Sequence, residues 1–162
     1  MEATDRKLMW HGMLLFLLGL VTGLLERRFT NVRMGLSAHL EGVMNGTFLL
    51  ALGAIWGQVK LPRLPKATAY GAALYGTYGN WLTTMLAAIF GTAANTPIAA
   101  AGYSGRPWQE RLVGAGFLSV AIAMVAFVLL VFWGLSGGAL QKDGSGEQAR
   151  TEISQGPQRQ RK

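Results

Sequence analysis

The stretch Ser37-Ala38-His39-Leu40-Glu41-Gly42-Val43-Met44-Asn45-Gly46 opens an otherwise apolar segment that runs to Val59. A histidine, a carboxylate and a carboxamide are costly in such a segment unless they are paired or take part in chemistry. On a helix, at about 100° per residue, His39 shares one stripe with glycines, whereas Glu41 and Asn45 share a stripe on the roughly opposite side. We expect protein or a ligand to cover both faces, unless the two ionisable residues lie solvated among lipid headgroups.

Composition predicts an all-α membrane protein. The chain has 162 residues, of which 51% are hydrophobic and only 14% are charged, against roughly a quarter charged in soluble domains. Four apolar runs separated by charged or Pro/Gly-rich breaks predict a bundle of four transmembrane helices, at about residues 8–25, 37–59, 68–90 and 112–135. We expect this transmembrane domain to occupy residues 1–140, followed by a disordered polar tail at residues 141–162.

The breaks between the runs favour a particular topology. The first run could be a signal peptide, but Glu26-Arg27-Arg28 follows it in place of a small-residue cleavage site. Residues 91–111 are rich in glycine and proline and predict a loop, either re-entrant or capping. An even number of helices places both termini on one side, and the six basic residues there, against five on the other, favour termini inside.

Charge and cysteine content exclude several classes of function. The net charge is +7 and the sequence pI is about 10.3. The basic residues lie between the apolar runs and in the tail, which fits membrane topology and anionic lipid better than nucleic-acid binding. The absence of cysteine excludes disulfides, thiolate metal sites, a thiol nucleophile and covalently attached c-type haem.

The two histidines constrain any metal site. His11 and His39 lie near the starts of consecutive antiparallel helices, hence on opposite sides of a hydrocarbon core ~30 Å thick. They cannot ligate one metal within a subunit, which disfavours a bis-histidine haem and still allows a haem with a single histidine ligand and an open sixth position. The glycines beside His39 would either admit a flat macrocycle or pack against another helix.

Two amides and an aromatic stripe are the remaining candidates for a site. Asn45 and Asn80 should reach comparable depths, roughly 10–15 Å below one surface, where they would orient a polar substrate or bond to each other. Tyr75, Tyr78 and Trp81 form a stripe that either belongs to the core or walls an aromatic pocket. The sequence has no serine–histidine–acid set, no glycine-rich phosphate loop and no cluster of carboxylates.

Residues 31–46, Asn-Val-Arg-Met-Gly-Leu-Ser-Ala-His-Leu-Glu-Gly-Val-Met-Asn-Gly, resemble the signature of bacterial hydroxylaminobenzene mutases and, more distantly, styrene oxide isomerase. The resemblance extends over His11-Gly12-Met13-Leu14 and Tyr78-Gly79-Asn80-Trp81 and covers about residues 10–135. It implies a small four-helix isomerase of the bacterial inner membrane that acts in nitroaromatic catabolism. It also implies a homotrimer with ferric haem b between the subunits.

The resemblance also assigns roles to residues. It implies that His39 ligates the haem iron, with Gly42 and Gly46 beside the macrocycle. It implies that Asn45 and Asn80 line the substrate pocket, where we expect them to be catalytic, and that Thr84 falls near a pocket tyrosine of the isomerase. From the aromatic stripe we expect Tyr78 and Trp81 to line the same pocket. Glu41 has no match in the isomerase and is therefore the candidate specific to the mutase reaction.

The leading hypothesis is therefore a haem-assisted mutase that converts an arylhydroxylamine into a 2-aminophenol. An epoxide-to-aldehyde isomerase is the alternative within the family. A small four-helix transporter with Glu41 as proton carrier belongs to another class, but such transporters usually carry the acid in the first span, which has none here. A non-catalytic electron-transfer subunit is disfavoured because a second axial histidine is lacking.

Overall fold

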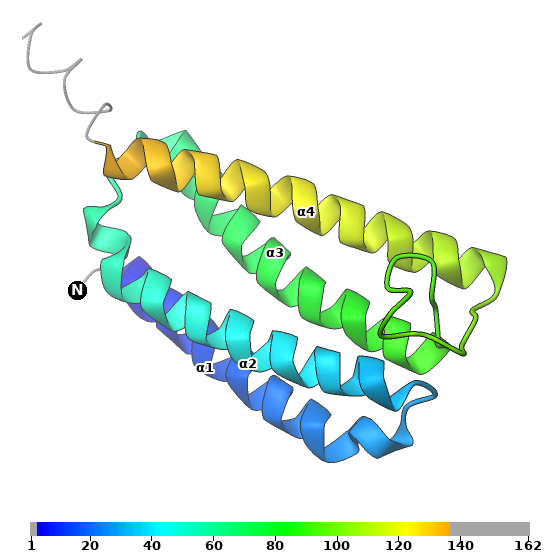
Figure 1. Ribbon diagram of the computed structural model, residues 1–162. Helices are drawn as coiled ribbons and strands as arrows, with labels where there is room; N and C mark the ends of the chain where they lie inside the picture. The colour runs from blue at the N-terminus through cyan, green and yellow to red at the C-terminus, as the bar shows by residue number, and fades with distance from the viewer. Residues whose placement is uncertain (1–2, 137–162) are drawn as a thin grey trace, which may run out of the picture.

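The computed structural model describes residues 3–136 and shows four helices running alternately up and down. They are α1 (Ala3–Leu25), α2 (Val32–Ile55), α3 (Arg63–Phe90) and α4 (Pro107–Leu135), with 3-10 turns η1 (Glu26–Arg28) and η2 (Trp56–Gln58) after α1 and α2. In Figure 1, α1 lies against α2, and α3 lies between α2 and α4. The expected all-α four-helix bundle is confirmed, whereas the tail predicted at residues 141–162 lies outside the described residues.

The helices begin earlier than their apolar runs. Three of them end where expected, at residues 25, 90 and 135, but all four start five residues upstream of the predicted positions. Helix hydrogen bonding continues into polar sequence because a first turn outside the hydrocarbon can be satisfied by water and caps. At α2, for example, the side chain of Asn31 accepts a hydrogen bond from the backbone N–H of Met34.

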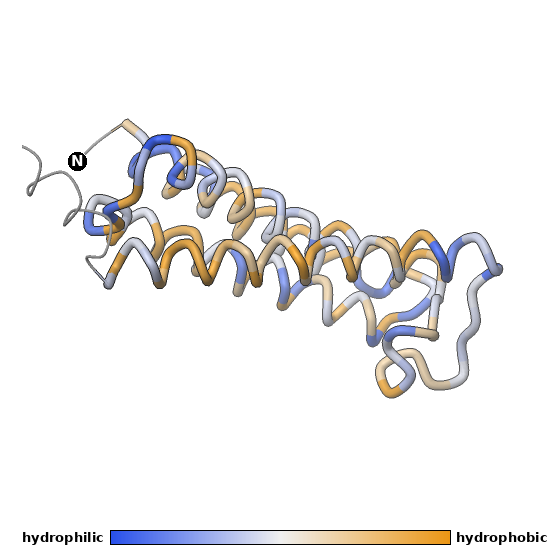
Figure 2. The backbone as a smooth tube through the Cα atoms, turned by 90° about the horizontal axis from the view of Figure 1, so that it is seen from above, coloured by the Kyte–Doolittle hydropathy of each residue, from blue (hydrophilic) through white to orange (hydrophobic). Residues whose placement is uncertain are grey.

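Three helical segments are long and apolar enough to cross a membrane, namely Ala3–Arg28, Val32–Gln58 and Pro107–Leu135. The chain is therefore a multi-pass membrane protein. The remaining helix, α3, does not qualify by composition. Its sequence includes asparagine, tyrosine, threonine and glycine among the apolar residues. Its 28 residues span about 42 Å beside α2 and α4, so the fourth crossing stays a prediction. Hydrophobic residues dominate the middle of α4 (Figure 2).

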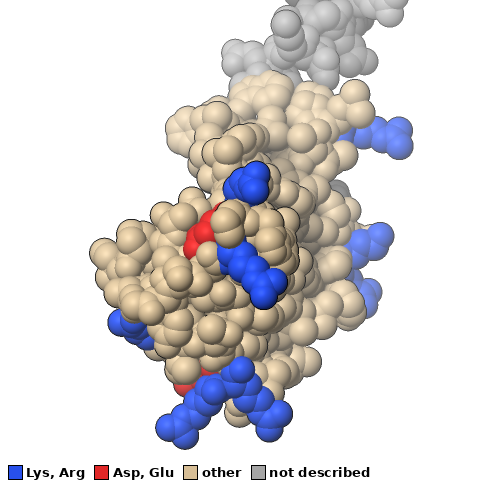
Figure 3. All heavy atoms as spheres, turned by 90° about the vertical axis from the view of Figure 1, so that its right-hand side faces the viewer, with Lys and Arg blue, Asp and Glu red and all other residues tan. Residues whose placement is uncertain are grey.

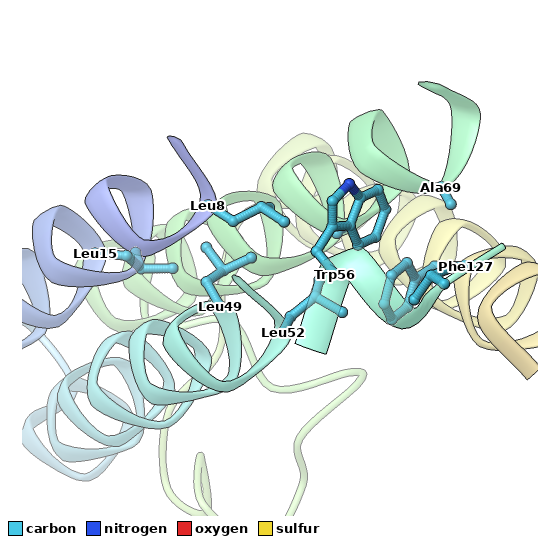
Figure 4. Packing of buried hydrophobic residues seen from close by; sticks show 9 residues of the cluster. Leu8, Leu15, Leu49, Leu52, Trp56, Ala69 and Phe127 are labelled. Carbon is cyan, nitrogen blue, oxygen red and sulfur yellow. The ribbon is translucent and has the colours of Figure 1, made fainter. Parts of the chain in front are cut away.

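The interior has a large cluster at one end of the bundle and a smaller one at the other. Trp56 is the largest fully buried side chain and belongs to the first cluster, shown in Figure 4. Met34, Ala87, Ala88, Ala100 and Val113 make up the second cluster. Many large apolar side chains face outward instead, among them Leu24, which is 84% exposed, and Phe132, which is 74% exposed. Outward-facing apolar side chains are what a lipid environment requires of a spanning bundle.

The segment between α3 and α4 folds back over one end of the bundle, as Figure 1 shows. The carboxylate of Glu110, in the first turn of α4, accepts hydrogen bonds from the backbone N–H groups of Ala93, Ala94 and Gly105. The side chains of Asn31 and Arg33 donate to carbonyl oxygens of the same segment. Of the two alternatives for this loop, the structure shows the capping one.

Candidate functional site

Glu41 lies at the centre of a polar cluster between α2 and α3. Its Oε2 atom accepts a hydrogen bond from Asn80 Nδ2 at 2.5 Å and another from Asn45 Nδ2 at 3.1 Å. Asn45 is one turn further along α2, so its amide reaches the carboxylate without bending the helix. The three residues predicted to be catalytic therefore converge. The two amides do not bond to each other, because the carboxylate bridges them.

The cluster leaves hydrogen-bond acceptors free. All three side chains are only partly buried. Within the described residues, no hydrogen bond occupies Glu41 Oε1 or the amide oxygens of Asn45 and Asn80. Because Nδ2 of each asparagine donates to Glu41, the cluster offers a carboxylate oxygen and two amide oxygens to a partner that donates hydrogen bonds.

Thr84 follows Asn80 by one turn on α3 and is 4% exposed. Its hydroxyl donates to the backbone oxygen of Asn80 at 2.9 Å. This bond inside the helix occupies the hydroxyl hydrogen, so Thr84 contributes bulk below the cluster and no free donor.

The aromatic stripe divides between different partners. The hydroxyl of Tyr78 donates to the carbonyl oxygen of His11 at 3.1 Å and lies 3.2 Å from His11 Nδ1. The indole N–H of Trp81 donates to the hydroxyl of Thr22 at 3.1 Å. The polar ends of Tyr78 and Trp81 are therefore bound to α1 and do not point to Glu41, and their expected place in a substrate pocket stays a prediction.

The residues that bind Tyr78 and Trp81, namely His11 and Thr22, had no functional role predicted from the sequence. Thr22 is buried and His11 is partly buried, both on α1. The only signal for them was that each is a polar residue inside an apolar run, and such residues commonly bond to another helix. The sequence could not indicate which residue of α3 each would meet.

His39 lies on the opposite face of α2 from Glu41, as the helical period predicts. Its Nδ1 atom is 2.8 Å from the carbonyl oxygen of Gly19, and its ring lies against Gly23. In the neutral imidazole this contact places the proton on Nδ1 and leaves a lone pair on Nε2. Within residues 3–136, Nε2 has no hydrogen-bond partner.

Gly42 and Gly46 lie in the contact between α1 and α2. A Cβ atom on Gly42 would overlap Gly19, and one on Gly46 would come within 2.6 Å of the backbone nitrogen of Phe16. The expected groove, open to a macrocycle at a subunit boundary, is therefore filled by α1 of the same chain. In this chain Gly42 and Gly46 therefore serve helix packing, the alternative that the sequence also allowed, and their expected place beside a macrocycle stays a prediction.

The surroundings of His39 fit an axial haem ligand. Haem iron needs one protein nitrogen on one side, and metal-bound histidines generally donate their other N–H to a carbonyl or carboxylate. Leu20, Leu24, Leu36 and Leu40 are 44%, 84%, 48% and 46% exposed and lie within one turn of His39 or of its α1 contacts, so exposed apolar side chains lie near His39 in the sequence of both helices. Among the described residues, no group of three or more His, Asp or Glu side chains could hold a bare metal ion.

Comparisons with known proteins identify relatives of the whole bundle. The family model for styrene oxide isomerase matches residues 4–136. Hydroxylaminobenzene mutase HabB of Ectopseudomonas oleovorans is 45% identical over 139 residues, or 85% of each chain. Hydroxylaminobenzene mutase HabA of the same organism is 41% identical over 125 residues, which are 76% of this chain and 93% of HabA. No solved structure matches significantly. The family match and both relatives extend across all the residues of the polar cluster, and the chain therefore belongs to the styrene oxide isomerase family.

Proposed function

We propose that this protein is a membrane-bound mutase that converts arylhydroxylamines of the hydroxylaminobenzene type into 2-aminophenols during nitroaromatic degradation. Its relatives make it an isomerase, and their names supply the substrate class. The observation that carries the proposal is the Glu41 carboxylate held between Asn45 and Asn80. A carboxylate with one oxygen fixed and one oxygen free is suited to move a proton on a substrate.

The free acceptors of the cluster match the substrate. An arylhydroxylamine donates hydrogen bonds through its N–H and O–H groups, and its ring is apolar enough to enter from the membrane. Glu41 Oε1 and the two asparagine oxygens are the atoms that would accept these bonds. The helices hold the three side chains in place before the substrate arrives, which lowers the cost of orienting it.

The reaction is an isomerisation without net redox change. The N–O bond breaks, positive charge spreads from nitrogen to the ortho carbon, and the departing oxygen forms a bond to that carbon. In our proposal, Asn45 and Asn80 orient the transferred oxygen, and Glu41 removes the ortho proton as aromaticity returns. The proton then passes to nitrogen, so that all atoms of the substrate are retained in the 2-aminophenol.

We also propose that His39 Nε2 ligates ferric haem b, because Nδ1 is already bound to Gly19. When bound, the haem iron would supply a Lewis acid that polarises the N–O bond. His39 and Glu41 lie on opposite faces of α2, so one copy of the chain presents them to different surroundings. We therefore propose a homotrimer in the bacterial inner membrane, in which neighbouring copies cover these faces.

Haem content tests the role of His39. Replacing His39 by alanine should abolish haem retention after purification, whereas His11→Ala should leave it intact because His11 bonds to Tyr78. The measurement is the Soret absorbance per protein, with size-exclusion chromatography to verify folding. Equal haem in the parent and the His39→Ala protein would exclude His39 as the ligand.

Product analysis tests the reaction itself. Membranes containing the protein should convert phenylhydroxylamine into 2-aminophenol, and in isotopically labelled water the new phenol oxygen should come from the substrate. Oxygen from solvent would contradict an intramolecular transfer. The family model favours a second candidate, an epoxide-to-aldehyde isomerase; conversion of styrene oxide alone would establish that activity in place of the mutase reaction.

A further inference from the structure

A cavity of about 360 Å³ opens at the end of the bundle where α1 and α3 begin. Its wall includes Thr4 and Lys7 of α1, Trp56 of η2, and Arg63, Lys66 and Tyr70 of α3. Neither the Glu41 cluster nor His39 contributes to this wall. The cavity is therefore separate from the candidate catalytic residues.

The charge of the cavity is positive. Lys7, Arg63 and Lys66 line it, and no acidic side chain does. Asp5, which precedes Lys7 on α1, is buried and is not part of the lining. Because α1 and α3 both begin here, the positive ends of two helix dipoles add to the same field. The cavity thus favours an anion.

Trp56 supplies a second, independent sign of a ligand. The side chain is 1% exposed, and its indole Nε1 has no acceptor among the described residues. Figure 4 shows this nitrogen turned away from Leu52 and Phe127, which pack against the other side of the ring. The ammonium of Lys66 lies 5.9 Å from the ring centroid. A buried N–H without an acceptor is costly, and an anionic oxygen entering beside Lys66 would remove that cost.

The position in the bundle favours a membrane lipid as the source of the anion. The cavity lies at the start of one helical segment that can cross a membrane, Ala3–Arg28, and at the end of another, Val32–Gln58. The ends of such segments are where phospholipid headgroups lie. Two large apolar side chains nearby face outward, Leu64, which is 79% exposed, and Trp10, which is 62% exposed. They offer apolar surface to acyl chains next to the basic cavity.

We propose that this cavity binds the phosphate of an anionic phospholipid headgroup. Lys7, Arg63 and Lys66 pair with the phosphate, and Trp56 donates its indole N–H to a headgroup oxygen. Bound lipid would then connect the start of α1 to the start of α3, two helices that otherwise make few contacts.

Native mass spectrometry of the purified full-length protein tests the proposal. Phosphatidylglycerol, phosphatidylcholine and inorganic phosphate are added separately. We expect phosphatidylglycerol to bind the parent protein at least tenfold more tightly than phosphatidylcholine. Affinity should fall tenfold or more in Arg63→Gln/Lys66→Gln. It should fall about fivefold in Trp56→Phe, which keeps an aromatic side chain at this position but lacks the indole N–H. The matched control, Arg27→Gln/Arg28→Gln, removes the same charge at the other end of the bundle and should bind like the parent.

The outcomes separate the possible ligands. Equal binding of the two lipids, or parental binding by the Arg63→Gln/Lys66→Gln protein, would overturn the proposal. If inorganic phosphate bound the parent protein as tightly as phosphatidylglycerol, the ligand would be free phosphate and the lipid assignment would be wrong. Lys7→Gln is the second variant if the double variant fails to fold, because Lys7 is exposed on α1, and it should weaken lipid binding in the same direction.

Discussion

Glu41 depends on two amides that come from different places in the chain. Asn45 follows it by one helical turn, and Asn80 is presented by α3. Both amides donate to the same oxygen, Oε2, which fixes the carboxylate and directs Oε1 away from them. Because the carboxylate is already oriented, little conformational entropy is lost when it meets the substrate proton.

Replacing Glu41 by glutamine should remove activity while leaving the bundle intact. Glutamine keeps the size of the side chain and an oxygen that can accept from Asn80, but it cannot take a proton. We expect the turnover of phenylhydroxylamine to fall by about 10²–10⁴, with an unchanged melting profile and haem content. Tyr75→Phe is the control, because Tyr75 is exposed and bonds to Ser119 on α4. Parental activity in Glu41→Gln would remove Glu41 from the mechanism.

At the scale of elements, the contact between α1 and α2 is built on glycines. Gly12 and Gly19 of α1 meet Gly46 and Gly42 of α2 so closely that backbone touches backbone. This approach also brings the carbonyl oxygen of Gly19 within hydrogen-bond distance of His39. Small residues therefore position His39 through the packing of α1 against α2.

Gly42→Ala tests this packing. The added methyl group would overlap Gly19, so we expect the free energy of unfolding in detergent to fall by about 1–3 kcal/mol. Gly71→Ala is the matched control, since nothing lies within 4 Å of a Cβ atom at that position of α3 and alanine favours a helix by up to ~1 kcal/mol. If the two variants were equally stable, α1 and α2 would accommodate the added methyl group without cost, and the close packing at Gly42 would not stabilise the bundle.

The loop between α3 and α4 depends on Glu110. Three backbone N–H groups converge on this carboxylate, and hydrogen bonds to a charged group contribute about 1.5–3 kcal/mol each. In Glu110→Gln we expect the amides of Ala93, Ala94 and Gly105 to exchange hydrogen about tenfold faster or more. Glu26→Gln, in which the replaced side chain makes no hydrogen bond within residues 3–136, should leave these amides unchanged. Unchanged exchange in both variants would assign the loop's order to other contacts.

At the scale of the molecule, basic residues mark both ends of the bundle. Figure 3 looks onto the end that carries the α3–α4 loop and shows several lysine or arginine side chains projecting from it. Arg27, Arg28, Arg33, Arg106 and Arg111 are exposed at this end. Five basic residues lie at the other end within the described chain, so the small excess seen in the sequence rests on Lys142, which lies outside the described residues.

The topology gives a direct prediction. If α3 crosses the membrane with α1, α2 and α4, reporter proteins fused to the two ends of the chain should lie in the same compartment. Fusions within the α1–α2 connection and within the α3–α4 loop should lie in the opposite one, because both connections are at the same end of the bundle. Termini in different compartments would mean that α3 does not span the bilayer.

The sequence by itself determined the helices and their faces. Apolar runs specify where helices form, because a backbone in lipid must satisfy its own hydrogen bonds, and the helical period alone places Glu41 and Asn45 together and His39 opposite them. The resemblance around His39 also indicated the family, which the comparisons confirm.

Only the tertiary structure decided which partner each face meets. The glycine face of α2 meets α1 rather than an open groove, Asn80 bonds to Glu41 rather than to Asn45, and Tyr78 bonds to His11. These outcomes depend on the rotation and axial register of one helix against another, set by side chains far apart in the chain. A periodic pattern defines the faces of a helix, but it carries no information about which neighbouring helix covers them.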